Sequence, residues 1–235
     1  FCTSQMDERT RKYITKQFEV VPFIYTISTY AKKKIIEEYK RNDITIIPNA
    51  IDDTVFYYKE KPENKKINIA LIGSQDTDFK RIDNILKAID ILKSEGYSLE
   101  VNWITPTTPH SNINAIVNPK QQVIGDTLRK SDIYICASMY EAFCLPVLEA
   151  MACGVPVIST RVGVVPDALG NKQKQFILKE RTKECLKERI IYLLNNKKLF
   201  QELSEENQQE IKDWTWQKIS KKFQDFFDEY LNNKE

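Results

Sequence analysis

The chain has 235 residues, enough for one large domain or two small ones, and its 42% hydrophobic and 29% charged residues are ordinary for a globular protein. Its 35 basic and 33 acidic residues give a net charge of +2, which by itself indicates no nucleic-acid-binding surface. The five cysteines are an odd number without a CxxC pair, which argues against zinc ribbons and thioredoxin-type redox sites. We therefore expect reduced thiols and a cytoplasmic protein.

Short apolar runs alternate with helical patterns, as in proteins built from βα units around a parallel sheet. The runs that predict strands are Pro22–Ile27, Ile44–Ile47, Ile67–Ile72, Leu99–Ile104, Ile113–Val117, Asp132–Ala137, Val155–Ser159 and Gln175–Leu178. The patterns that predict helices are Thr29–Arg41, Arg81–Glu95, Gln121–Lys130, Pro146–Cys153, Thr182–Asn195, Lys198–Lys212 and Gln217–Leu231. Because several strands are apolar on both faces, we expect an α/β fold with a Rossmann-like parallel sheet and helices on both faces.

A change in composition divides the chain. Residues 52–66 are polar, contain Pro62 and lack periodicity, which predicts a linker between residues 1–51 and a main domain at 67–213. The first segment has too few strands to be a domain alone, and residues 214–235 form a C-terminal helix. The apolar stripe of that helix is typical of packing rather than of a ligand site; it consists of Ile219, Phe223, Phe226, Phe227 and Tyr230.

Neither end of the chain carries a recognisable targeting signal. The first residue is Phe, no charged-then-apolar leader follows it, and the apolar runs are too short to span a bilayer. We therefore expect the chain to be an excerpt of something longer. Lys32–Lys34 suit a solvated helix face, with peripheral membrane contact as the second interpretation.

The most informative stretch is Ala137–Thr160, where a strand, a loop and a helix that begins at Pro146 follow one another. The free N–H groups at such a helix end, together with the helix dipole, can bind an anion such as phosphate. Glu149 lies one turn into the helix and leans toward its start, and Glu141 lies in the loop before it. The alternative is that Glu149 caps its own helix and Glu141 is merely solvated.

Glu141 and Glu149 form an E-x7-E pattern that is followed by Ala150–Val157, AMACGVPV. This resembles the donor-site signature of retaining GT-B glycosyltransferases, specifically glycosyltransferase family 4. Further segments resemble that family's hinge and glycine motifs in the right order, namely Thr26–Ala31, Ile47–Asp52, Gly73–Lys80 and Gly163–Asp167. The resemblance runs from about Thr26 to the C-terminus and implies a GT-B fold.

The resemblance also implies roles for single residues. Glu141 would be the catalytic residue beside the transferred sugar, Lys80 would hold the donor diphosphate, and Glu149 would accept hydrogen bonds from the ribose hydroxyls. The remaining donor-binding positions implied are Gly73, Ser74, Arg81, Ser138 and the backbone N–H groups of Phe143, Cys144 and Leu145. No metal and no cofactor are implied, because the helix dipole and Lys80 can stabilise the leaving diphosphate.

Four positions depart from the family's pattern. Ser74 replaces the second diphosphate-binding arginine, and Arg81 replaces a glycine, so Arg81 can supply the missing charge from one residue along. Cys144 replaces a glycine in the loop that approaches the sugar, where its side chain would narrow the pocket. Val164 replaces the second glycine of the motif at Gly163–Asp167.

The function implied is a retaining, hexosyltransferase-type enzyme that moves a sugar from a nucleotide diphosphate sugar to a glycan or lipid-linked acceptor. Its place would be the cytoplasm, at the inner face of the membrane, and its acceptor domain would lie mostly outside this chain, with residues 1–51 as a remnant. A GT-B epimerase or phosphorylase is a second enzyme reading that Ile47–Asp52 argues against. A non-catalytic partner or chaperone subunit of an active glycosyltransferase is the alternative from another class.

Overall fold

The computed structural model describes residues 7–61, 65–110 and 113–232. Outside them lie residues 1–6 of the expected N-terminal segment, Pro62 of the expected linker and residues 233–235 of the expected C-terminal helix.

Five parallel strands form the central sheet in the order β5-β4-β3-β6-β7. They are β3 (Ile67–Ile72), β4 (Leu99–Thr105), β5 (Ala115–Val117), β6 (Ile133–Cys136) and β7 (Val157–Ser159). Leu71 of the central strand pairs with Trp103 on one side and Ile135 on the other. The strand order reverses direction between β3 and β6, and such a switch point is where open α/β sheets bind their ligands.

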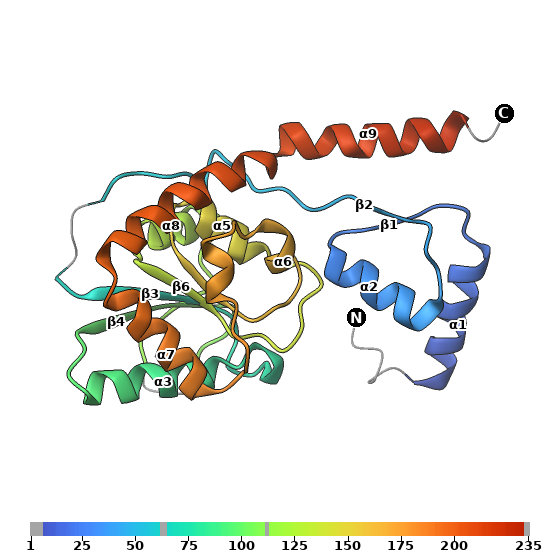
Figure 1. Cartoon of the computed structure of the whole chain (residues 1–235). Helices are drawn as coiled ribbons and strands as arrows, with labels where there is room; N and C mark the ends of the chain where they lie inside the picture. The colour runs from blue at the N-terminus through green and yellow to red at the C-terminus, as the bar shows by residue number, and fades with distance from the viewer. Residues whose placement is uncertain (1–6, 62–64, 111–112, 233–235) are drawn as a thin grey trace.

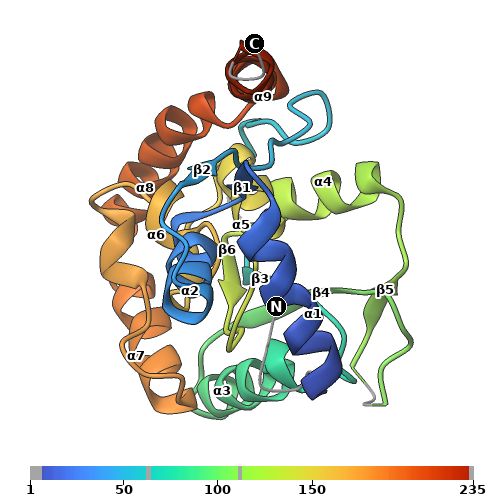
Figure 2. The ribbon, with the colours of Figure 1, turned by 90° about the vertical axis from the view of Figure 1, so that its right-hand side faces the viewer.

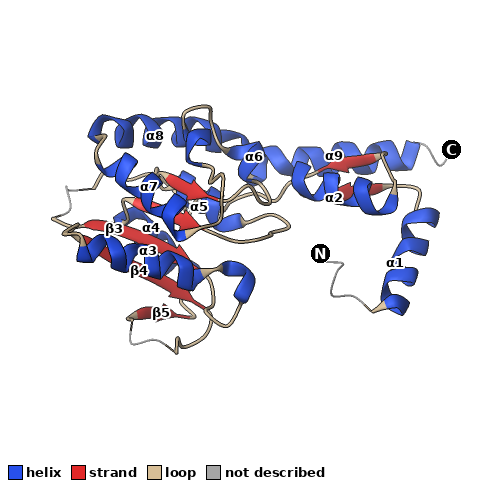
Figure 3. Cartoon of the chain, turned by 60° about the horizontal axis from the view of Figure 1, so that its bottom comes forward, coloured by secondary structure: helices blue, strands red, loops and turns tan. Residues whose placement is uncertain are grey.

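Helices cover both faces of this sheet (Figures 1 and 3). The two on one face are α3 (Ile82–Ser94) and α7 (Lys183–Leu194), and the opposite face carries α4 (Gln121–Lys130) and α5 (Leu145–Ala152). A further helix, α8 (Lys197–Glu210), packs against both α5 and α7. Alternate residues of β3 enter different cores, because Ile69 and Leu71 pack with the α3 side and Ala70 with the α5 side. The expected α/β fold class is thereby confirmed.

A second, smaller unit lies beside the sheet domain (Figures 1 and 2). It consists of α1 (Glu8–Val20), β1 (Ile24–Thr26), α2 (Thr29–Tyr39) and β2 (Ile44–Ile46), and its two strands pair in parallel. The long helix α9 (Trp216–Asn232) runs from the sheet domain to this unit. Ile51 and Thr215 form a parallel bridge, so the chain crosses between the two parts as two paired segments.

The apolar stripe of α9 is largely a packing surface, as expected. Ile219 and Phe226 are buried against Ile47 and Ala50. Phe227, however, keeps 52% of its surface exposed, so the stripe is narrower than the sequence pattern suggests.

The expected strand at Gln175–Leu178 is wrong, because a 3₁₀ helix occupies Gln173–Phe176 and only Ile177 bridges to β7. The buried side chain of Gln173 explains this. Its amide accepts from the Val157 N–H at 3.1 Å and donates to the Val157 carbonyl at 2.7 Å. One side chain thus satisfies the edge of β7 where a neighbouring strand would otherwise pair.

No helix in the described ranges combines the length and apolar character that a membrane span needs. In the triplet at 32–34, Lys32 donates to the Ile44 carbonyl at 2.6 Å and Lys34 pairs with Glu37 at 2.9 Å. The exposed Lys34 pair suits a solvated helix face, whereas Lys32 is half-buried against β2, and peripheral membrane contact stays a prediction.

Candidate functional site

Two loops flank the switch point of the sheet, one after β3 and one after β6. They are joined by their backbones, because the Met139 N–H donates to the Phe79 carbonyl at 2.7 Å. Their aromatic rings also stack, with the centroids of Phe79 and Tyr140 4.6 Å apart. This pairing sets the position of the residue that follows each ring, Lys80 on one loop and Glu141 on the other.

Lys80 and Glu141 form the ion pair at the centre of the site, with Nζ and Oε1 2.5 Å apart. The hydroxyl of Ser138 donates to the same Glu141 oxygen at 2.8 Å. Both charged side chains are largely covered, with 22% and 14% of their surfaces exposed. Burial alone would lower the pKa of Lys80, but the adjacent carboxylate more than offsets this and holds that pKa above its usual value.

Helix α5 begins at the end of the second loop. Cys144 precedes it in the left-handed conformation, with φ 71° and ψ 59°, and Pro146 occupies the second helical position rather than the first. Pro146 has no N–H, and the Val147 N–H donates to the Cys144 carbonyl at 3.1 Å, so in this first turn the Leu145 N–H is the group left for an anion. The left-handed backbone explains why the resembled family prefers glycine where this chain has Cys144.

The neighbouring loop holds Phe143 in place. Its ring is buried and lies 6.3 Å from that of Trp214, so only its backbone can reach a ligand. Its carbonyl accepts from the Val164 N–H at 2.6 Å. A Cβ at Gly163 would lie 2.2 Å from the same carbonyl oxygen, so this position requires glycine.

Glu149 lies in α5 with only 7% of its surface exposed. Burial raises the pKa of its carboxyl to about 7. Within the described ranges, no hydrogen bond or ion pair reaches this carboxyl, so it does not cap its own helix. A buried carboxyl without a partner is costly, and a ligand hydroxyl could satisfy it.

Two cysteines border the ion pair. The Sγ atoms of Cys136 and Cys144 lie 3.5 Å apart, and both lie within 4.8 Å of a Glu141 oxygen. The hydrogen bond from Cys144 lowers the pKa of Cys136 to about 6, and the same contact with burial raises that of Cys144. The sequence marks Cys144 as a pocket residue, but the contact between these two thiols, eight residues apart, is seen only in the fold. Its spacing could suit a metal ion, but the Lys80 ammonium already neutralises the carboxylate.

Three further residues expected at the donor site are Gly73, Ser74 and Arg81, and only Gly73 lies beside the ion pair. Gly73 lies beside Lys80, because a Cβ there would lie 3.3 Å from Ile82 Cδ1 and 3.4 Å from the Lys80 side chain. Ser74 is turned to a separate polar cluster, where its hydroxyl lies 2.9 Å from Thr107 Oγ1 and 3.3 Å from Asp76 Oδ2. Arg81 is exposed, with φ 55°, and no contact of its side chain is recorded within the described ranges.

His110 belongs to the Ser74 cluster. Its Nε2 lies 2.6 Å from Asp76 Oδ1, and its side chain is 79% exposed. The hydrogen bond from Thr107 lowers the pKa of Asp76, and the bond to His110 adds to this. This cluster at the ends of β3 and β4 is a second feature that the sequence did not indicate.

The small N-terminal unit directly contacts the loop that follows β6. Ser28 Oγ donates to the Ala142 carbonyl at 2.8 Å, and the Thr29 N–H donates to Asp167 at 2.8 Å. Asp167 lies in the short helix α6 (Val165–Ala168). The start of α2 therefore faces the loop that carries Glu141.

Residues 110–210 match the family model described as Glycosyl transferases group 1. The MMP alpha-(1->4)-mannosyltransferase of Mycolicibacterium hassiacum is 25% identical over 64% of this chain and 39% of its own length. The probable sucrose-phosphate synthase of Thermosipho melanesiensis is 25% identical over 96% of this chain and 58% of its own. The chain thus spans about half the length of these curated relatives.

Among solved structures, the fold is similar to that of HepE from Anabaena in complex with UDP and glucose. The TM-score is 0.82 at 11% identity, covering 96% of this chain and 68% of that one. The likeness to this structure shows the fold, and the match to the family model is confined to residues 110–210.

Proposed function

We propose that this chain is the donor-binding part of a retaining glycosyltransferase that uses a nucleotide diphosphate sugar. The observation that carries the proposal is the Lys80–Glu141 ion pair, which lies between two loops at the switch point and beside the start of α5. A lysine and a helix N-terminus stabilise a diphosphate, and a carboxylate beside them stands where the sugar would lie.

Donor binding would rearrange this pair. The diphosphate carries more negative charge than Glu141 and would take over the Lys80 ammonium, while the Leu145 N–H at the start of α5 would hold another of its oxygens. Glu149 would accept hydrogen bonds from the ribose hydroxyls, which would relieve its unpartnered burial. Glu141 would then be free to face the transferred sugar.

Catalysis would come from stabilising the leaving group. When the glycosyl bond breaks, negative charge develops on the nucleoside diphosphate, and Lys80 and the α5 dipole would stabilise it. This positive charge is the basis for our proposal that no metal ion is needed. Retention would require the acceptor hydroxyl to approach from the side on which the diphosphate leaves.

The acceptor would need a second wall. Positioning of an acceptor hydroxyl can be worth several kcal/mol of barrier, and in this fold it is expected from the domain opposite the sheet. Of that wall, the small N-terminal unit lies within the described ranges, and it contacts the loop of Glu141 through Ser28 against Ala142. The chain alone is therefore expected to bind donor but not to transfer sugar.

A non-catalytic GT-B-like partner is the alternative. The turn of Ser74 into the Asp76–Thr107 cluster favours it, because no arginine stands at that diphosphate position. Hydrolysis or transfer of donor by the longer protein, abolished by Glu141→Ala, would separate an enzyme from a partner.

The direct test is a thermal-shift panel of UDP, GDP, ADP and TDP with their sugars. A ligand that binds only the folded state raises its stability by about 2.7 kcal/mol at a hundredfold excess over its dissociation constant. We expect at least one nucleoside diphosphate to stabilise the chain, whereas a divalent metal alone does not. Loss of that shift in Lys80→Met is the matched control, and no shift with any member at millimolar concentration would refute the donor site.

A further inference from the structure

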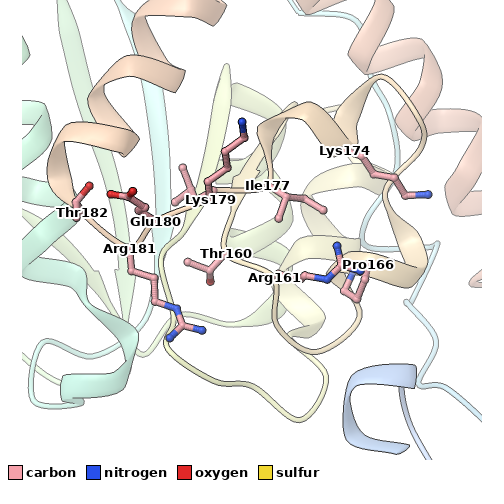
Figure 4. A pocket seen from close by; sticks show the side chains of 10 residues that line it. Thr160, Arg161, Pro166, Lys174, Ile177, Lys179, Glu180, Arg181 and Thr182 are labelled. Atoms are coloured by element: carbon pink, nitrogen blue, oxygen red, sulfur yellow. The ribbon is translucent and has the colours of Figure 1, made fainter. Parts of the chain in front are cut away.

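A hollow of about 970 Å³ opens beyond the carboxyl end of β7, next to the proposed donor site (Figure 4). Its lining is strongly basic. Four cations, Arg161, Lys174, Lys179 and Arg181, stand against one acid, Glu180. Figure 4 shows Arg161 and Arg181 on either side of Thr160 in this view.

These four cations are unpaired. Within the described ranges, no ion pair or hydrogen bond is formed by the side chain of any of them. Nearby lysines behave differently, since Lys172 pairs with Glu202 at 2.8 Å and Lys187 with Glu95. Like charges gathered without counterions repel one another, so a bound anion would relieve the arrangement.

The hollow is connected to the donor site through one residue. Thr160 lines it and donates from Oγ1 to the Ser138 carbonyl at 2.6 Å, while the Ser138 hydroxyl holds Glu141 at 2.8 Å. Pro166, also in the lining, directly precedes Asp167, which binds the start of α2. The hollow and the proposed donor site are thus neighbours that share no lining residue, so a molecule anchored in the hollow would leave the place of the donor diphosphate unoccupied.

We infer that this hollow binds the phosphate group of a phosphorylated acceptor, with Arg161 and Arg181 as its main anchors. Guanidinium groups match phosphate oxygens in pairs and keep their charge at all ordinary pH values, and the two lysines add charge at the rim. Identifying the phosphorylated ligand as an acceptor rests on the proposed function, whereas the phosphate site itself depends only on the hollow. A soluble sugar phosphate and a phospholipid headgroup share this chemistry.

The test measures binding to the 235-residue chain by calorimetry, with a nucleoside diphosphate present to block the donor site. The probes are glucose 6-phosphate, glucose and vesicles with or without phosphatidic acid. We expect glucose 6-phosphate to bind and glucose not to bind. The double variant Arg161→Gln/Arg181→Gln should weaken the binding of glucose 6-phosphate by roughly tenfold or more. The control variant Lys87→Gln/Lys93→Gln removes two exposed cations of α3 and should change nothing.

The outcomes are distinct. Binding of phosphatidic acid vesicles that needs both arginines, without affinity for glucose 6-phosphate, would support the phosphate site and assign it to a headgroup. Equal affinity in the double variant and the control variant, or no phosphate affinity in a chain that binds nucleoside diphosphate, would overturn this inference alone. If no nucleoside diphosphate binds, the proposed function fails. Whether glucose 6-phosphate binding depends on the two arginines still tests the phosphate site in the hollow.

Discussion

The ammonium of Lys80 is hydrogen-bonded to the carboxylate of Glu141 at 2.5 Å, so these two charges at the candidate site neutralise each other. A diphosphate must therefore compete with Glu141 for this lysine. The pair preorganises both side chains across the switch point and keeps two largely buried charges from standing alone. Separating this ion pair would therefore reduce the net free energy of donor binding.

Glu141→Gln is accordingly expected to bind nucleoside diphosphate a few times more tightly than the wild type, because Lys80 is released and a repelling charge is removed. Lys80→Met should weaken the same ligand by roughly tenfold to a hundredfold, since a charge-assisted hydrogen bond to phosphate is lost. Calorimetry with the diphosphate and with the bare nucleoside measures both effects. Weaker diphosphate binding by Glu141→Gln would show that the pair does not compete with the ligand.

Arg81 offers a test of charge against backbone strain. If Arg81 replaces the arginine absent at Ser74, Arg81→Ala should weaken the binding of nucleoside diphosphate roughly tenfold to a hundredfold. The affinity for the bare nucleoside should stay unchanged. Arg81→Gly should lose the same affinity but raise the melting temperature, because φ 55° suits glycine. Unchanged affinity in both variants would leave Lys80 and the helix end to act alone.

Glu149 predicts a pH dependence of stability. Its pKa in the folded chain is about 7 against 4.5 without burial, so the folded state binds this proton more tightly. Its stabilising contribution is complete below pH 4.5 and is lost as the pH rises through 7, an effect of roughly 3 kcal/mol.

Glu149→Gln should therefore be more stable than the wild type at pH 8, and the difference should disappear toward pH 4.5. Denaturant unfolding at a series of pH values measures it, with Glu188→Gln on the exposed face of α7 as the control. A difference that does not change with pH would mean that Glu149 is not protonated in the folded chain. Because ribose hydroxyls favour the charged carboxylate, nucleoside diphosphate should also bind more tightly as the pH rises through 7.

The Cys136–Cys144 contact can be tested by its effect on one thiol. Cys144→Gly removes the hydrogen bond that lowers the pKa of Cys136, so that pKa should rise from about 6. Cys144→Ser keeps a donor at the same place and should preserve most of the effect. The ¹³Cβ chemical shift of Cys136, followed as a function of pH, reads this titration directly. Identical curves in the two variants would contradict the role of Cys144.

The parallel sheet could be predicted because strands such as Ile67–Ile72 are apolar runs with clear ends, whereas the strand order that creates the switch point comes from the fold. The same local pattern failed at Gln175–Leu178, where the side-chain amide of Gln173 rather than a strand completes β7. The basic hollow was invisible for a similar reason. Its cations come from loops more than ten residues apart, and only the fold brings Arg161 and Arg181 to one place.

The helix α9 has a consequence for biosynthesis. The face formed by Phe23 and Ile47 is translated early, but its covering residues Ile219 and Phe226 are about 200 residues downstream. At about 5 to 20 residues per second, a ribosome needs roughly 10 to 40 s to deliver them. During that interval the nascent chain displays an uncovered aromatic surface that chaperones can recognise. A stop codon before Trp216 would therefore leave the sheet domain nearly whole and still send the product toward aggregation or proteolysis.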